Sequence, residues 1–313
     1  WSSILAPVEL LDVLARRRSV RRFKPLPLPE EDLEKLLFAL QRAPTDASAQ
    51  LYSAIRVRDP RLRDEVARLS GDQEHIRQAA EFFLFLADVH RLERLLAHRG
   101  QRMAFWPRTA LHFAILDAGI AASYLALTAE ALGYGVCFIG GVLNGVETLT
   151  DLLGLPPGAL PVVGLAVGVP DAVGPPRPRL PRRLVVHEDR YRPYAAEDLE
   201  EAYRAMAPYS RVGDWNRVLR RYFAEGGTME AREKPYGKVL SRQGFDPDLP
   251  KGAPFYSLGA LLEEALAEAR GVLFRKGEVW LEEEARAFRG EGRPGEALLM
   301  ALRKARGEVP DWP

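Results

Sequence analysis

Cysteine is almost absent from this chain. Only Cys137 occurs among 313 residues, so an intrachain disulfide framework and a metal site built from several thiolates are both excluded. Cys137 lies in the apolar run GVCFIGG, where a small buried side chain is the simplest interpretation. Because so little cysteine suits a reducing compartment, we expect a cytoplasmic protein.

A surplus of positive charge is also missing. The chain has 44 Lys and Arg against 43 Asp and Glu, for a formal net charge of +1. Proteins that neutralise many nucleic-acid phosphates usually carry an excess of basic side chains. We therefore expect no nucleic-acid partner, although a nucleic-acid binder that uses the basic stretch from Arg16 to Lys24 remains an alternative.

Long uninterrupted apolar runs are not present either. The longest candidate, around Ala110 to Ala131, is broken by Asp117 and Glu130. The first residues also lack the basic stretch, apolar segment and small-residue cleavage site of a signal peptide. These observations predict no membrane association.

The common catalytic motifs are missing as well. There is no G-x-S-x-G, no G-x-x-x-x-G-K-[ST], no H-E-x-x-H and no G-x-G-x-x-G after a strand, and the five histidines show no metal-ligand spacing. A hydrolase with its own nucleophile or metal is therefore poorly supported, and we expect no metal site. A flavin enzyme needs none of these groups, because the cofactor ring carries the hydride.

The apolar patterns that are present alternate between helices and strands. Apolar faces and start and stop signals predict helices at 7–17, 29–43, 60–71, 108–135, 144–155, 197–206 and 228–242. Apolar runs predict strands at 53–59, 80–89, 161–170 and 183–191, and a buried strand or turn at 135–141. The composition changes near Gly244, and three charged helical patterns follow. We therefore expect one domain over 1–245 and a helical C-terminal extension over 246–313.

The segment RRRSVRRFKP, from Arg16 to Pro25, places six basic side chains around Ser19. Such a cluster suits a nucleic-acid backbone, a membrane surface or a single bound phosphate. The balanced overall charge argues against the first of these, and three other segments favour the last.

Four segments occur in a characteristic order: RRSVRRF, SGDQEHIRQAAEFFLFLADVHR, LGYGVCFIGGVLNGVETLTDLLGLP and PRPRLPRRLVVHEDRY. Together, over residues 8–245, they resemble the FMN-dependent nitroreductase superfamily, especially the NADPH-linked oxygen-insensitive nitroreductases and flavin reductases. The resemblance implies an α+β fold with a mostly antiparallel central sheet, flanking helices and a long buried central helix. It also implies an intertwined homodimer with FMN at the subunit interface, each site drawing residues from both chains.

The resemblance assigns the basic cluster to the flavin phosphate. The residues that match the family's phosphate-binding stretch are Arg17, Arg18, Ser19 and Arg21. Guanidinium forks match phosphate oxygens, and a hydroxyl adds a further hydrogen bond. The alternative is a solvated basic helix end, which is the interpretation favoured for Arg16, Arg22 and Lys24. The segment RPR matches the family's [KR]-P-R and adds Arg177 and Arg179 to the cofactor site, unless it is only a Pro-rich surface loop.

Other matches imply contacts to the flavin ring. Thr45 falls on the small hydroxyl residue that touches the ring or ribityl, unless it is only a turn residue beside Pro44. The resemblance places Gln73 at the pyrimidine edge of the ring. His75 either lies at the ring as well or caps or solvates the start of a helix. The aromatic-Ile-Gly-Gly element corresponds to Phe138, Ile139, Gly140 and Gly141, whose glycines let the backbone approach the ring. The chain departs from the family at Glu74, where relatives often have Lys, and at Phe138, where Tyr is frequent.

The implied function is an FMN-dependent NAD(P)H oxidoreductase that works by ping-pong hydride transfer through the flavin N5. Nitroaromatics, quinones or flavins would be the small-molecule acceptors, and no side chain would serve as a catalytic group. Candidates for holding the NADPH 2′-phosphate are Arg211, Arg217 and Arg232, although for each one taken singly a place on a solvated helix face is the favoured interpretation. Two alternatives stay open: another flavin chemistry on the same fold, such as dehalogenation or ring fragmentation, and a non-enzymatic flavin-binding or redox-sensing protein.

Overall fold

The computed structural model describes residues 9–210 and 212–245. The predicted extension over 246–313 and the candidate Arg211 lie outside the described residues. The division of the chain at residue 245 therefore stays a prediction.

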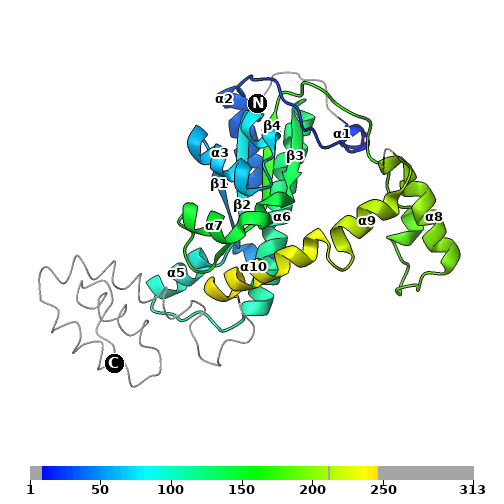
Figure 1. The fold of residues 1–313 in the computed structure, drawn as a ribbon. Coiled ribbons are helices and arrows are strands. Elements are labelled where there is room, and N and C mark those ends of the chain that lie inside the picture. The colour runs from blue at the N-terminus through cyan, green and yellow to red at the C-terminus, as the bar shows by residue number, and fades with distance from the viewer. Residues whose placement is uncertain (1–8, 211, 246–313) are drawn as a thin grey trace, which may run out of the picture.

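A four-stranded antiparallel sheet forms the centre of the described part of the chain (Figure 1). Its strands are β1 (Tyr52–Arg56), β2 (Glu81–Asp88), β3 (Gly135–Ile139) and β4 (Ala159–Gly168). They lie in the order β1-β2-β4-β3, and every neighbouring pair is antiparallel. The predicted antiparallel sheet and three of the four predicted strands are confirmed, and the predicted strand or turn at 135–141 contains a strand.

Both faces of the sheet are covered by helices. Along β2, Phe83 and Phe85 pack with α2 (Glu30–Gln41) and α6 (Pro107–Ala131) on one face. The intervening Phe82 and Leu84 pack with α3 (Pro60–Leu69), α4 (Glu74–Gln78) and α7 (Val146–Leu152) on the other. Because alternate side chains of a strand point to opposite faces, a strand buried on both sides has the continuous apolar sequence seen here.

The long helix α6 runs across one face of the sheet. Its buried side is rich in small side chains, among them Ala114, Ala118 and Ala121, which allow close packing on the strands. Length and composition alone would let α6 cross a membrane, so the expectation that no run is long enough was wrong. One or two carboxylates in a window of 18 residues still leave its mean hydropathy high enough. The packing of α6 against the sheet nevertheless identifies a core helix, as predicted.

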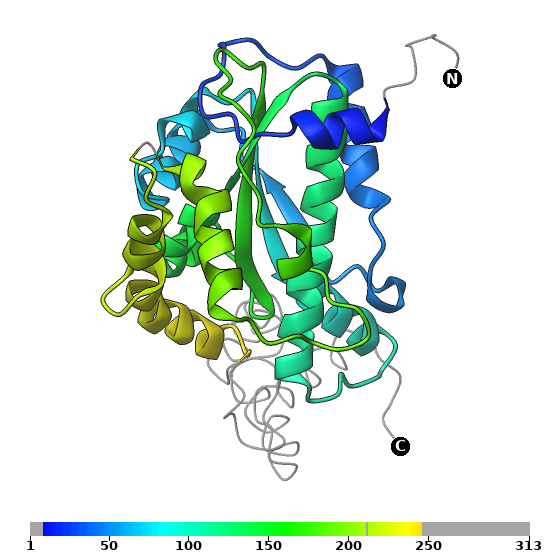
Figure 2. The ribbon, with the colours of Figure 1, turned by 90° about the vertical axis from the view of Figure 1, so that its right-hand side faces the viewer.

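The remaining described elements surround this core. They are α1 (Leu10–Arg16), α5 (His90–His98), α8 (Ala196–Met206), α9 (Trp215–Phe223), α10 (Thr228–Arg242) and the 3-10 turns η1 (Asp46–Ser48), η2 (Gly140–Gly145), η3 (Arg182–Leu184) and η4 (Ala207–Tyr209). In Figure 1 α8 and α9 form an arm that extends away from the sheet, and α10 returns from it to α7. In Figure 2, which faces the arm, the chain between β4 and α8 lies in front of α6, and Figure 1 shows that this chain runs out to the arm.

The strand predicted at 183–191 is wrong. The structure has the 3-10 turn η3 at its start and irregular backbone after it. Val185 and Val186 are 60% and 58% exposed instead of packed in a sheet. A strand needs a neighbouring edge to satisfy its backbone groups, and no described strand pairs with this segment. The segment predicted as a strand or turn at 135–141 is a strand only as far as Ile139, where η2 begins.

Candidate functional site

The basic segment after α1 lies along β3. Ser19 forms a parallel bridge with Val136, and the Val20 N–H donates to the Val136 carbonyl at 2.9 Å. Val20 is buried while Arg21 is exposed, so the extended segment sends apolar side chains inward and cations outward. Gly135 makes this approach possible, because a Cβ there would lie 2.7 Å from Cγ2 of Val20.

The basic segment also contacts the Pro-rich loop that follows β4. Arg18 Nη1 donates to the Gly174 carbonyl at 2.9 Å, and Arg22 pairs with Asp171 at 2.8 Å. In the same loop the guanidinium of Arg177 lies 4.3 Å from the ring centroid of Tyr209. The two predicted phosphate-binding segments are therefore side by side, although they are far apart in the sequence.

Several of these cations act electrostatically on the same side chain, the thiol of Cys137. The thiol is buried, as predicted. Burial raises the pKa of Cys137, and the positive charges of Arg21, Arg17 and Arg177 act against that rise. Three predicted site residues thus lie within electrostatic reach of one atom in β3. Arg179 is turned to its own loop, where Nη1 donates to the carbonyls of Arg177 and Pro178.

The buried carboxyl of Glu130, near the end of α6, lies close to Arg17 and Arg18 of the basic segment. Burial raises the pKa of Glu130, while Arg17 and the backbone N–H of Arg18 lower it. Its Oε2 is buried without a hydrogen-bond partner among the described residues. Sequence reasoning did not assign Glu130 to the site, although a carboxylate in an otherwise apolar helix was visible.

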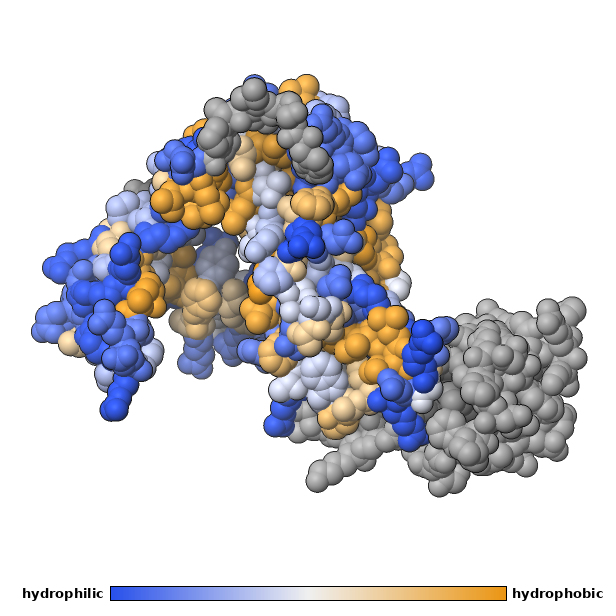
Figure 3. Space-filling model, turned by 180° about the vertical axis from the view of Figure 1, so that it is seen from behind, coloured by the Kyte–Doolittle hydropathy of each residue, from blue (hydrophilic) through white to orange (hydrophobic). Residues whose placement is uncertain are grey.

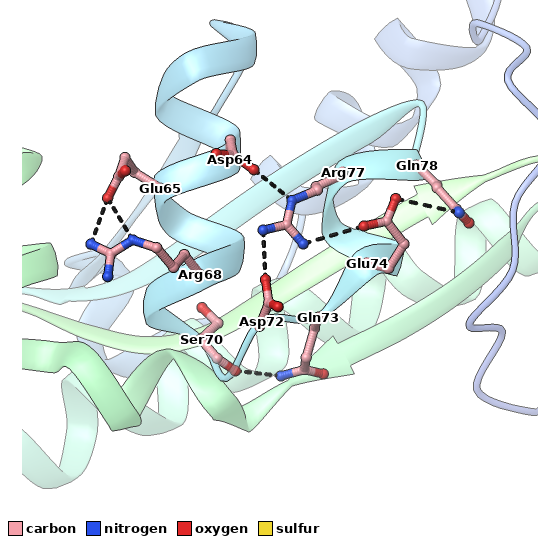
Figure 4. A network of polar contacts seen from close by, with 9 residues as sticks. All are labelled: Asp64, Glu65, Arg68, Ser70, Asp72, Gln73, Glu74, Arg77 and Gln78. Atoms are coloured by element: carbon pink, nitrogen blue, oxygen red, sulfur yellow. Dashed lines mark hydrogen bonds and ion pairs between the residues drawn. The ribbon is translucent and has the colours of Figure 1, made fainter.

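Gln73 and Gly141 are in contact. Gln73 Nε2 donates to the Ser70 carbonyl at 2.7 Å in the turn between α3 and α4 (Figure 4). A Cβ on Gly141 would lie 2.3 Å from both Gln73 Nε2 and the Ser70 oxygen, so only glycine fits. A Cβ on Gly140 would meet nothing within 4 Å. The start of η2 is therefore closed by the Gln73 turn on one side and open on the other.

His75 is buried close to these groups. Its Nε2 has no hydrogen-bond partner among the described residues. Burial lowers the pKa of His75, and the charge of Arg21 lowers it further. The ring is therefore neutral near pH 7, and an unsatisfied nitrogen beside a cation cluster is suited to a polar ligand.

Thr45 is not brought to the other site residues within one chain. It lies just before β1, which is the sheet edge opposite β3. Its Oγ1 accepts the Gln50 N–H at 3.3 Å, which is the turn role considered for it. Phe138 is exposed on β3, whereas Ile139 is buried in the core.

The NADPH candidates occupy different places. Arg232 Nε donates to Asn144 Oδ1 at 2.8 Å, so α10 is attached to η2 close to the glycines. Arg217 is exposed on the first turn of α9, where its backbone N–H is capped by Asp214. The structure thus places Arg232, but not Arg217, beside the glycine turn.

The residues present fit FMN. A phosphate is matched by the cations Arg17, Arg18, Arg21 and Arg177 around one end of β3. A flat ring is matched by the open side of Gly140, and polar ring atoms by Gln73 and the unsatisfied His75 nitrogen. The assignment of each residue to FMN stays a prediction.

Comparisons with known proteins show the family of this chain. The family model described as "Nitroreductase family" matches residues 14–169. The chain is 34% identical over 183 residues, 58% of this chain and 74% of the other protein, to an "FMN reductase (NADPH)" of Bacillus subtilis. It is 33% identical over 243 residues, 75% of this chain and 97% of the other protein, to an "Oxygen-insensitive NADPH nitroreductase" of Salmonella typhimurium.

A solved structure shows the same fold. It is the NADPH:FMN oxidoreductase from Vibrio harveyi complexed with NAD+, with a TM-score of 0.67 and 28% sequence identity over 75% of this chain and 97% of that one. The antiparallel sheet with its long core helix is thus the fold of a class of flavin oxidoreductases. The chain belongs to the nitroreductase family, which is FMN-dependent and uses NAD(P)H.

Proposed function

We propose that this chain is an NADPH-dependent FMN oxidoreductase that reduces small-molecule acceptors such as nitroaromatics, quinones or flavins. The observation that carries the proposal is the contact of Arg18 with the Pro-rich loop, beside the start of β3. The names of two relatives, an FMN reductase (NADPH) and an oxygen-insensitive NADPH nitroreductase, support the choice of cofactor and electron donor.

Each part of the site has a physical task in this proposal. When bound, FMN would supply the redox chemistry, which is hydride transfer from NADPH or NADH followed by electron transfer to the acceptor in a ping-pong cycle. Arg17, Arg18, Arg21, Arg177 and Arg179 neutralise the phosphate, and Ser19 adds a hydroxyl. Gly140 and Gly141 bring backbone close to the ring, while Gln73 binds its polar edge. Arg232 is the candidate for the NADPH 2′-phosphate that lies beside the glycine turn.

We further propose a homodimer that completes each site. The exposed side of α6 carries two exposed large side chains, Leu116 and Tyr124. Figure 3 shows apolar surface around the hollow between the arm and the rest of the molecule. Large exposed apolar patches are typical of protein interfaces. Thr45, at the far sheet edge, would reach a flavin only in the neighbouring subunit's site.

The purified protein tests the proposed function directly. We expect a yellow FMN spectrum, bleaching on anaerobic addition of NADPH, and recovery of the absorption on addition of a nitroaromatic or a quinone. Arg18→Ala should lose bound FMN, whereas Arg99→Ala, exposed at the end of α5, should keep it. A wild-type protein that stays colourless with excess FMN would refute the proposal.

Other outcomes select the alternatives. A flavin that neither NADPH nor NADH bleaches indicates a non-enzymatic flavin binder or redox sensor. Bleaching without recovery by nitroaromatics or quinones indicates another flavin chemistry on the same fold. A colourless protein whose retention on DNA falls steeply with salt indicates a nucleic-acid binder.

The domain division and the location belong to the same proposal. We propose that residues 1–245 suffice to bind FMN, that 246–313 are an addition to this unit, and that the enzyme is cytoplasmic. Any shortened chain must keep Phe245, which is buried, and Gln243, whose Nε2 donates to the carbonyls of Pro156 and Ala159 at 2.9 and 2.8 Å.

A further inference from the structure

The turn between α3 and α4 has an unusual backbone. Gly71 has a φ of +90°, and the next residue, Asp72, has a φ of +54°. Left-handed backbone costs free energy in a residue with a side chain and persists where surrounding contacts hold it. Gln73, the predicted ring contact, follows immediately. Its position therefore depends on whatever holds Asp72.

Arg77 holds this turn from α4. Its Nη2 contacts Asp72 Oδ1 at 2.7 Å, its Nε contacts Asp64 Oδ1 on α3 at 2.6 Å, and its Nη1 contacts Glu74 Oε2 at 3.2 Å (Figure 4). The Arg77 side chain is only 27% exposed. A guanidinium presents its donors in a rigid plane, so one side chain joins α3, the turn and the start of α4.

The residues on both sides of Gln73 are therefore held by the same cation. The Gln73 amide is also oriented, because the Ser70 carbonyl can only accept and must face the amide NH2. This leaves Oε1 as the atom directed away from Ser70, which makes it an acceptor. The pyrimidine edge of an oxidised flavin carries one N–H donor, at N3, which matches an acceptor there.

We propose that Arg77 is a positioning residue of the FMN site, which holds Asp72 and Glu74 so that the Gln73 carbonyl oxygen accepts the flavin N3–H. This inference rests on the proposed function. Arg77 itself touches no cofactor. It acts through Gln73, so its contribution to FMN affinity disappears when the Gln73 side chain is removed.

A double-mutant cycle on FMN affinity tests the inference. Fluorescence titration gives the FMN dissociation constant for the wild type, Arg77→Ala, Gln73→Ala and the double variant. We expect each single variant to bind about five-fold more weakly, the usual effect of one hydrogen bond. The double variant should bind no more weakly than Gln73→Ala alone.

Arg68 is the matched control. It lies on α3, and among the described residues its side chain pairs with Glu65 at 2.7 Å (Figure 4). Only its backbone carbonyl contacts the Gln73 turn, by accepting the N–H groups of Gly71 and Asp72 at 3.2 Å, and this contact is kept in Arg68→Ala. Arg68→Ala should bind FMN as the wild type does. If Arg77→Ala fails to fold, Arg77→Lys replaces it in the cycle, because a lysine keeps the charge without the fork.

Three results overturn the inference. They are wild-type affinity in Arg77→Ala and in Arg77→Lys, losses that multiply to about 25-fold in the double variant, and an equal loss in Arg68→Ala. The absorption band of bound FMN gives an independent readout, because loss of the N3–H contact should shift it equally in Arg77→Ala and Gln73→Ala. A wild-type protein without FMN affinity refutes the proposed function instead, so the two failures are distinguishable.

Discussion

Gly141 is the residue at which the candidate site has least room. An added Cβ would come within 2.3 Å of Gln73 and of the Ser70 backbone. The backbone oxygen cannot move aside without displacing the end of α3. The fit of η2 against this turn therefore depends on a single missing methyl group.

We predict that Gly141→Ala destabilises the protein by about 1–3 kcal/mol, the usual cost of overpacking. Urea denaturation of the FMN-free protein measures it. Gly140→Ala is the control, since its Cβ has open space, and it should leave the stability unchanged. Equal stability of the two variants would contradict the prediction.

Glu130 adds a pH dependence at the residue scale. Its pKa is raised above the usual 4.5 by burial, against the opposing charges of Arg17, Arg18 and Arg16. The folded state therefore keeps a proton at pH values where the unfolded state has lost it. Stability from this group falls as pH rises from about 4.5 to the folded-state pKa.

We predict that Glu130→Gln removes this loss. The stability of the variant relative to the wild type should rise with pH across that window, by at most about 1.4 kcal/mol per pH unit, and then stay level. Denaturation midpoints between pH 4.5 and 8 give the profile. Glu34 is exposed on α2, and the stability of Glu34→Gln should change with pH in the same way as that of the wild type. A parallel profile for Glu130→Gln would show that the buried carboxyl does not titrate as argued.

At the scale of elements, α6 holds the loop that leads into β1. Asp117 is buried in α6 and accepts the N–H of Asp46 at 3.0 Å and of Leu51 at 2.9 Å. The loop between them contains positive φ at Ala47, Ser48 and Gln50, of 46°, 56° and 53°. One carboxylate thus supports strained backbone next to Thr45.

We predict that Asp117→Asn destabilises the protein by about 1–3 kcal/mol, because an amide NH2 replaces one buried acceptor and faces an N–H. Hydrogen exchange should show faster exchange of the Asp46 and Leu51 amides. Ser123→Ala on the exposed side of α6 is the control and should change neither quantity. Unchanged exchange in Asp117→Asn would refute the role of this carboxylate.

Helix boundaries could be predicted where they depend only on neighbouring residues. Pro60 follows Asp59, whose side chain accepts the Leu62 N–H at 2.8 Å, and α3 begins there as predicted. The segment 183–191 has equally good strand composition, yet its strand is absent. A helix satisfies its backbone groups within its own segment, whereas a strand depends on an edge supplied from elsewhere.

At the scale of the whole molecule, the exposed face of α6 is the surface that we propose for the homodimer. Leu116 is 49% exposed there, while Leu95 on α5 is 58% exposed away from it. The two leucines are similar in exposure and differ in place. Substitutions at the two positions therefore distinguish an effect on a specific interface from an effect of general surface hydrophobicity.

We predict that Leu116→Lys weakens the homodimer at least ten-fold in its dissociation constant, because a charge would be buried without a counter-charge. Sedimentation velocity over a concentration series measures it. Leu95→Lys should leave the dimer intact. A monomeric wild type, or equal effects of both changes, would refute this interface.

The sequence alone determined the local chemistry of this protein. Three features depend only on neighbouring residues and could be identified in the sequence itself. They are the cation-rich stretch around Ser19, the paired glycines Gly140 and Gly141, and the apolar runs of β2 and α6. The resemblance then predicted the fold and the family. None of these required a long-range contact to be known.

Only the tertiary structure decided which groups meet. It placed Arg18 against Gly174, buried Glu130 behind the cations, and set Arg77 across the Gln73 turn. From the sequence alone, Arg77 cannot be distinguished from an ordinary surface cation. The physical reason is that backbone preference acts over a few residues, while charge pairing and burial are settled by segments that fold together from distant parts of the chain.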